Sequence, residues 1–162
     1  MLRLKISACI ESSPEQTWAV LSNIENISDW AEPVLSARCT SVERKGIGAE
    51  RVCDLQGNIQ ISEKWIEWQE GRSFTYQGYG LPLVEEATNT WSIVPSKGKS
   101  LLVSQSTIKL KGGIWGRLLE PLMKLLSRRM AADSLAAFKY LVENGHPYRG
   151  KFSSLPRVPA LC

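Results

Sequence analysis

The stretch Glu11–Trp30, ESSPEQTWAVLSNIENISDW, decides the fold, because it inserts helix between a first strand and a long run of strands. Ser13 is a good helix N-cap, and Pro14 suits the first helical position. Gln16, three residues after the cap, completes the pattern of a capping box. The spacing therefore predicts a helix over residues 14–22.

The remainder of the first two thirds of the chain has the pattern of strands and turns. Residues 2–10 alternate between apolar and polar side chains, which predicts a strand with one buried face. A second short helix is expected near 24–30, and Pro33 ends it. Six more strands are expected over 34–43, 49–56, 59–68, 73–79, 85–94 and 100–111. Short glycine-rich connections favour antiparallel hairpins, so we predict an α+β fold with a seven-stranded curved antiparallel sheet.

One long helix is expected from about Ile114 to Asn144, ending at Gly145. Pro121 predicts a kink or break, which would make residues 112–121 a mobile flap. The apolar stripe also changes face along this helix. It comprises Trp115, Leu118, Leu119, Leu122 and Leu126, then Ala131, Leu135, Phe138 and Val142.

Charge is distributed unevenly along the 162 residues. Residues 1–108 hold 10 Lys/Arg and 13 Asp/Glu, a net charge of −3, whereas residues 109–162 hold 10 and 3, a net charge of +7. A basic C-terminal third suits an anionic lipid surface, nucleic acid or an acidic ligand, or simply a solvated helix face with a basic tail. We expect no nucleic-acid partner.

Cys9, Cys39, Cys53 and Cys162 show no metal-type spacing. The N-terminus lacks the apolar region of a signal peptide, and no apolar run is long enough to span a bilayer. These features predict a reduced, cytoplasmic protein without disulfides. The expected organisation is one ligand-binding domain over 1–145 and a flexible basic tail over 146–162.

Several motifs together resemble the polyketide cyclase/dehydrase and lipid-transport family of the SRPBCC (START-like, Bet v 1-like) superfamily. The resemblance covers about residues 2–144. Its matching segments are Ser13-Pro14-Glu15 with Trp18, Asp29-Trp30 with Pro33, Gly46 and Gly48, Glu63, Phe74-Thr75-Tyr76, Trp91 with Pro95, and the closing LAAFKYLVEN. It implies a helix-grip fold, in which the curved sheet surrounds the long C-terminal helix. It also implies a cavity between sheet and helix for a hydrophobic or amphipathic small molecule.

The sequence contains no recognisable catalytic or cofactor motif. The single histidine, His146, fits a helix C-terminus, and no GxSxG, GxGxxG or P-loop pattern occurs. We therefore expect no metal and no cofactor. Glu63 is the most notable acid, because it shares an apolar strand face with Ile61 and Trp65. It is interpreted as a polar anchor or general acid/base, as one half of an ion pair with Arg51 or Arg72, or as a residue that rotation of the strand leaves outside.

The candidate site residues follow from shared faces of the expected strands and from the long helix. Candidate catalytic residues are Glu63, Tyr76 and Arg129; Arg129 is alternatively half of a surface pair with Asp133. Aromatic side chains with a few polar tips are the usual form of a small-molecule site, although ordinary core packing is the competing interpretation. The candidate ligand-binding residues are Glu63, Trp65, Phe74, Tyr76, Asn89, Trp91, Trp115, Leu118, Leu122 and Leu126.

Three functions are compatible with these residues. The leading one is binding or carriage of a small hydrophobic ligand, because no catalytic set is recognisable. The second is a cyclase or dehydratase in which Glu63, Tyr76 or Arg129 moves protons. The third is a module that contacts anionic membranes or proteins through the basic C-terminal third.

Overall fold

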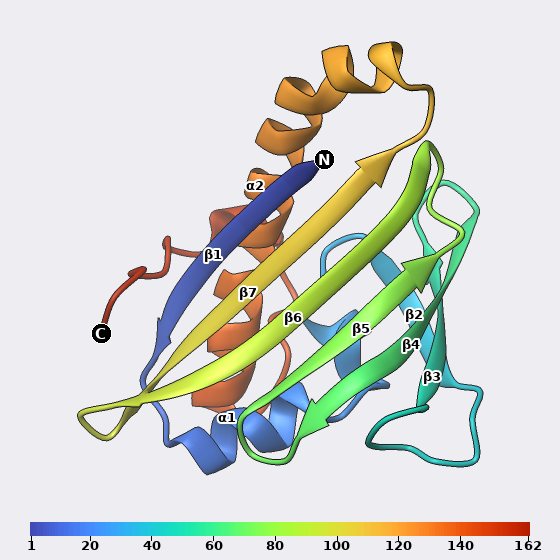
Figure 1. Cartoon of the computed structure of the whole chain (residues 1–162). Helices are drawn as coiled ribbons and strands as arrows, with labels where there is room; N and C mark the ends of the chain where they lie inside the picture. Colours follow the sequence, from blue (N-terminus) through green and yellow to red (C-terminus); the bar gives the residue numbers. More distant parts are fainter.

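The structure, a computed structural model, describes the backbone of residues 1–162 and every side chain except that of Arg117. Seven strands and two α-helices make up most of the chain (Figure 1). In chain order the elements are β1 (Leu2–Ile10), α1 (Pro14–Leu21), the 3-10 helix η1 (Asn26–Asp29), β2 (Val34–Cys39), β3 (Glu50–Leu55), β4 (Ile59–Gln69), β5 (Ser73–Tyr79), β6 (Val84–Ser96), β7 (Lys99–Leu110), α2 (Ile114–Asn144) and the 3-10 helix η2 (Phe152–Ser154).

The strands form one antiparallel sheet in the order β1-β7-β6-β5-β4-β3-β2. From β2 to β7, strands that follow one another in the chain are also adjacent in the sheet. β1 lies at one edge of the sheet, where it pairs with β7. Figure 1 shows the sheet curving around α2, with α1 at one end of the sheet. This arrangement confirms the predicted α+β helix-grip fold.

The helical insert begins as the sequence predicts. Ser13 is the N-cap of α1, its side chain accepts a hydrogen bond from the Gln16 amide, and Pro14 is the first helical residue. The second half of the expected capping box is absent, because the Gln16 side chain accepts from the Ser12 hydroxyl instead. Trp18 and Leu21 are buried, so α1 closes one end of the concave face.

The core lies between the concave face of the sheet and the helices. Trp30 of the segment after η1 is central to it, because its ring meets Trp91 of β6 at 5.6 Å and Phe138 of α2 at 5.1 Å in edge-on geometry. Such aromatic pairs stabilise a core beyond the area they bury. Four of the six tryptophans are less than 10% exposed, which fits a role in packing.

α2 is continuous through Pro121, so the predicted break does not occur. Figure 1 shows the helix bending in its first turns, the part that contains Pro121, and projecting beyond the ends of the strands. A proline inside a helix removes one hydrogen bond and crowds the preceding turn, which accounts for a bend. Gly145 ends the helix with φ of 75°, as expected. None of the described helices is long and apolar enough to cross a membrane.

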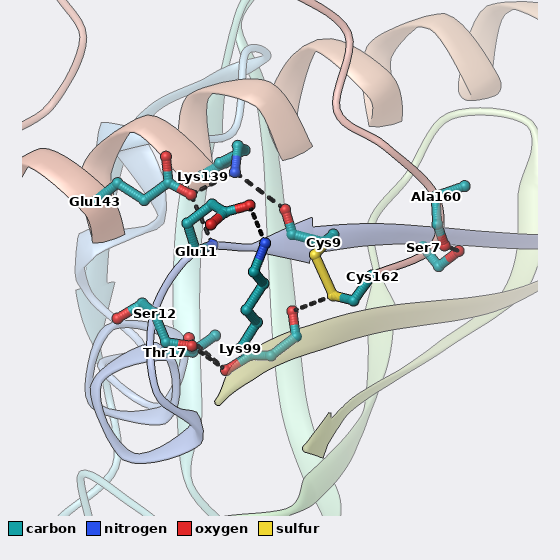
Figure 2. Close-up of a disulfide and its surroundings, with 11 residues drawn as sticks. Ser7, Cys9, Glu11, Ser12, Thr17, Lys99, Lys139, Glu143, Ala160 and Cys162 are labelled. Atoms are coloured by element: carbon teal, nitrogen blue, oxygen red, sulfur yellow. Dashed lines mark hydrogen bonds and ion pairs between the residues drawn. A yellow bond between two sulfur atoms is a disulfide. The ribbon is translucent and has the colours of Figure 1, made fainter. Parts of the chain in front are cut away.

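The predicted absence of disulfides is wrong, because Cys9 and Cys162 form one (Figure 2). Their Cα atoms lie 5.0 Å apart although 153 positions separate them in the sequence. Disulfides are rare in reducing compartments, so this bond also counts against the reducing environment that the sequence suggested. Cys39 and Cys53 are free.

Residues 146–162, expected to form a flexible tail, return along the outer edge of β1. The Cys9 amide donates to the Pro159 carbonyl, and the Ser7 hydroxyl donates to the Ala160 carbonyl, each at 2.7 Å. An edge strand has unpaired backbone groups, and the tail satisfies some of those on β1. The tail is therefore attached to the sheet in this structure.

Candidate functional site

A cavity of about 260 Å³ lies between the concave face of the sheet and α2. A second cavity of about 160 Å³ adjoins it on the side of β4. The two share Tyr76, Asn89, Ser106 and Ile108 as lining residues. Two neighbouring spaces therefore share one set of side chains, the larger between the sheet and α2 and the smaller along the sheet.

These spaces exist because small side chains occupy positions that large side chains would have to occupy to fill the interior. Ser104 and Ser106 on β7 contribute hydroxymethyl groups, and Ser127 and Ala131 on α2 are equally short. Protein interiors are close-packed, so such small residues on two opposing elements leave room between them. The apolar part of the larger cavity includes Trp30, Trp91 and Ile6 among others.

A hydrogen-bonded polar cluster lies within this mostly apolar lining. Ser104 and Ser106 donate to the Asn89 amide oxygen at 2.9 and 3.2 Å. The Asn89 amide nitrogen donates to the Tyr76 hydroxyl oxygen at 3.2 Å. Since the Tyr76 oxygen accepts here, and no acceptor among the described residues takes its proton, that proton is available to a bound molecule.

Burial keeps the Tyr76 hydroxyl protonated. Desolvation, with a smaller effect from the nearby Glu63 carboxylate, raises the pKa of Tyr76 to about 12, although Arg51 and the hydrogen bonds from Asn89 and Trp91 oppose this change. A phenol with this pKa is a hydrogen-bond donor throughout the physiological range. Tyr76 is therefore suited to hold a carbonyl or hydroxyl oxygen and is poorly suited to act as a base.

A buried ion pair borders the smaller cavity. Arg51 and Glu63 are direct cross-strand partners on β3 and β4, and the Arg51 Nε lies 2.5 Å from the Glu63 Oε2. The two residues are 4% and 6% exposed, so both charges are removed from water. The Cys53 thiol also reaches Oε2 at 3.8 Å. The structure thus bears out the ion-pair interpretation of Glu63, with Arg51 and not Arg72 as its partner.

Arg51 is held by its surroundings as well as by Glu63. Its Nη1 donates to the Ile24 carbonyl at 2.7 Å, and its guanidinium lies 5.0 Å from the Trp65 ring centroid. Desolvation is the largest single influence and would lower the pKa of Arg51, but Glu63, together with Tyr76 and Cys53, more than offsets it, so the net pKa is raised. A fixed positive charge therefore holds the Glu63 carboxylate in place. Among the described donors, none reaches Oε1 of Glu63, which lines the smaller cavity.

Four candidate site residues from the sequence meet at the cavities: Glu63, Tyr76, Asn89 and Trp91. Trp65 and Phe74 lie outside the lining and belong to the packed core, at 1% and 3% exposure. The centroids of the Trp65 and Phe74 rings lie 5.8 Å apart. These two residues therefore pack in the core and do not line the cavities, as the competing interpretation held.

The candidates on the first half of α2 do not reach the cavities. Trp115, Leu118, Leu122 and Leu126 are 77%, 66%, 55% and 46% exposed, and Arg129 is also exposed. Part of the reason is that the helix begins beyond the strand ends (Figure 1), where the sheet offers nothing to pack against. Further along, Ser127, Met130 and Ala131 line the larger cavity, so Leu126 and Arg129, on other faces of the helix, stay exposed. No ion pair between Arg129 and Asp133 occurs among the described side chains.

The sequence reasoning missed the small and hydroxylated lining residues. Ser104, Ser106 and Ile108 alternate along β7 on the same face, which is a period-two pattern visible in the sequence. Serines at alternate positions of an otherwise apolar strand face are a signal of a polar, incompletely filled interior. Ser127 and Ala131 carry a weaker signal, because short side chains are common on helices.

Fold and site together define a helix-grip protein of the START-like, Bet v 1-like class. The chain belongs to the family described as polyketide cyclase/dehydrase and lipid transport, whose model matches residues 1–143. No curated protein matches the chain.

Solved structures agree with this fold at low sequence identity. The protein XoxI from Bacillus cereus is 19% identical, with a TM-score of 0.73 over 89% of this chain and 97% of that one. The Zhui aromatase/cyclase from Streptomyces sp. R1128 is 12% identical, with a TM-score of 0.74 over 88% and 93%. A START superfamily protein from Mycobacterium smegmatis is 16% identical, with a TM-score of 0.68 over 88% and 97%. At these identities the likeness concerns the fold alone.

Proposed function

We propose that this protein binds a small, mostly apolar molecule between the sheet and α2. The observation that carries the proposal is the polar cluster of Tyr76, Asn89, Ser104 and Ser106 inside an apolar lining. Buried polar groups are costly unless they are satisfied, and the Tyr76 proton is left without a described partner. A ligand oxygen would satisfy it, while burial of the ligand's apolar body would supply most of the affinity.

The same lining favours a ligand with two kinds of polar group. Tyr76 offers a hydrogen-bond donor, and Glu63, which lines the smaller cavity and has no described donor on Oε1, offers an acceptor. We assign a carbonyl or ether oxygen of the ligand to Tyr76 and a hydroxyl group of the ligand to Glu63. Trp91 and Ile6 would contact its apolar part.

Binding stands ahead of cyclase or dehydratase activity. Proton transfer would need a free acid or base, but the Glu63 carboxylate is engaged by Arg51 and the Tyr76 pKa is about 12. Replacing Glu63 by Gln tests the enzymatic alternative. Turnover of a poly-carbonyl substrate that falls with Glu63→Gln, while ligand affinity stays unchanged, would favour the enzyme.

Native mass spectrometry of freshly purified protein tests the proposal directly, because a bound molecule adds its mass to the folded chain. For a molecule found in this way, Tyr76→Phe should weaken affinity about 5- to 10-fold, the value of one hydrogen bond. Ser106→Leu should block binding by filling the space, whereas Gln105→Leu, on the exposed face of the same strand, should leave affinity unchanged. Equal affinity of the Ser106→Leu and Gln105→Leu variants would contradict the site.

A further inference from the structure

The first half of α2 carries an exposed apolar surface that no part of the described chain covers. We call residues Ile114–Met130 the projecting half-helix. Ile114, Trp115 and Leu118 are 75%, 77% and 66% exposed, and Leu122, Leu125 and Leu126 are between 46% and 55% exposed. Monomeric proteins rarely expose apolar side chains so densely, and such patches mark contact with another molecule or with a membrane.

The position of the projecting half-helix makes it accessible to a large partner. Figure 1 shows its first turns extending beyond the strand ends, whereas Ser127 and Met130 near its other end line the larger cavity beside the sheet. Leu83, on the loop before β6, is 61% exposed and lines a shallow apolar hollow of about 230 Å³ together with Trp115 and Leu119. The apolar surface therefore continues from the helix onto the neighbouring loop. Tryptophan is favoured at boundaries between apolar material and water, because its ring is apolar and its N–H group is polar.

The charge around this surface indicates what covers it. Residues 111–130 contain five basic residues and one acidic residue. The acidic residue, Glu120, is paired with the N-terminal ammonium group at 2.8 Å. Lys124, Arg128 and Arg129 are exposed, and none of them makes an ion pair with another described side chain. The partner of the half-helix must therefore be apolar beneath and negatively charged at its surface.

We propose that the projecting half-helix docks on the surface of an anionic lipid bilayer. Its leucines and Trp115 enter the boundary between headgroups and acyl chains, and its basic residues contact acidic headgroups, as in helices that lie in the membrane interface. A second copy of the chain fits less well, because a symmetric contact through this face would bring the two sets of basic residues together. Docking does not depend on whether the cavity binds a ligand.

Co-sedimentation with vesicles tests the proposal. The full chain should bind vesicles of phosphatidylcholine with 30% phosphatidylglycerol, a composition on the order of that needed to attract basic segments, and should bind pure phosphatidylcholine far more weakly. Binding should weaken as salt rises, because salt screens charges. The double substitution Leu118→Ser with Leu122→Ser should lower the partition coefficient by about tenfold or more.

Two matched controls separate docking from unfolding and from general stickiness. Val42→Ser with Ile47→Ser removes two apolar side chains that are 98% and 69% exposed elsewhere, and it should leave vesicle binding unchanged. Lys124→Glu with Arg129→Glu should abolish the preference for anionic lipid, whereas Lys45→Glu with Lys97→Glu, also exposed, should not. Circular dichroism and melting temperature should be the same for all four variants.

A depth measurement identifies the residue that inserts. Lipids brominated along the acyl chain should quench tryptophan fluorescence in the anionic vesicles, and most of this quenching should be lost in Trp115→Phe. The proposal is overturned if the chain does not bind anionic vesicles, or if Leu118→Ser with Leu122→Ser binds as well as the unaltered chain. It is also overturned if that variant instead dissociates a dimer in sedimentation velocity, because the face would then join two copies.

Discussion

The two halves of α2 belong to one unbroken helix but differ in what surrounds them. In the projecting half-helix, large apolar side chains are about half to three-quarters exposed, whereas Leu135, Phe138 and Leu141 in the second half are at most 8% exposed. Both halves have apolar residues at helical spacing. The difference shows that periodicity identifies a face in need of a partner without saying whether that partner lies in the same chain.

The second half finds its partners because it lies over the sheet and beside β1. Phe138 packs on Trp30, and Lys139 and Glu143 bond backbone groups at the end of β1. Figure 2 shows the contacts of Lys139 and Glu143 next to the disulfide that fixes the tail to the same strand. The start of the first half has passed beyond the strand ends, where its neighbours are the N-terminus, the end of β7 and the loop at Leu83. Only toward Ser127 and Met130 does this half line the cavity beside the sheet.

The largest expected effect comes from removing the same side chain from each half. Leu135→Ala should lower the free energy of unfolding by about 2–5 kcal/mol, because it leaves a cavity in a packed site. Leu118→Ala should change it by about 0.5 kcal/mol or less, because Leu118 is 66% exposed. Urea denaturation followed by circular dichroism measures both. A cost for Leu118→Ala close to that for Leu135→Ala would mean that the projecting half-helix is packed in solution.

The second expected effect concerns the disulfide beside the packed half. Cys162→Ser should lower the free energy of unfolding by about 2–4 kcal/mol, because the bond closes a very long loop in the unfolded chain. Amide exchange should become faster in the tail and in β1 but should not change in the projecting half-helix. Cys39→Ser is the matched control, since Cys39 is a free thiol. Identical urea midpoints for the two variants would show that the bond does not form in solution.

The sequence predicts the frame of this fold well, because local chemistry defines its ends and turns. Ser13 and Pro14 place the start of α1, Gly145 ends α2, and the strand boundaries of β4, β5 and β7 differ from the prediction by one residue or fewer. Each of these features depends on neighbours in the chain. Local signals therefore suffice for the order and type of the elements.

The site is predicted only in part, because it depends on which faces meet in space. Glu63, Tyr76, Asn89 and Trp91 were found through shared strand faces, and these do line the cavities. The disulfide joins residues 153 positions apart, with no local signal for either partner. The position of the Leu118 face depends on where the helix leaves the sheet. Such contacts follow from the bend of α2 and the path of the tail, which no short stretch of sequence specifies.

The smallest expected effect is a loss of stability in mild alkali, which arises from two side chains of the sheet, Cys53 on β3 and Tyr76 on β5. Burial raises the pKa of the Cys53 thiol to about 11, and Tyr76 also has a raised pKa, of about 12. Both groups hold their protons more tightly in the folded chain than in the unfolded chain. Deprotonation therefore favours unfolding, and stability is lost as pH rises above about 9.

Between pH 8 and pH 10 the free energy of unfolding should fall by about 1–2 kcal/mol, mostly through Cys53, whose unfolded-state pKa is the lower of the two. Urea midpoints across this range should show a shallower decline for Cys53→Ala than for the unaltered chain, and Tyr76→Phe should flatten the decline only above about pH 10. Neither group lies in the projecting half-helix, so vesicle binding by that segment should not follow the same pH dependence. A decline of equal slope in Cys53→Ala would mean that the thiol is hydrated in solution, and hence that the sheet is less tightly closed around Arg51 and Glu63 than the structure has it.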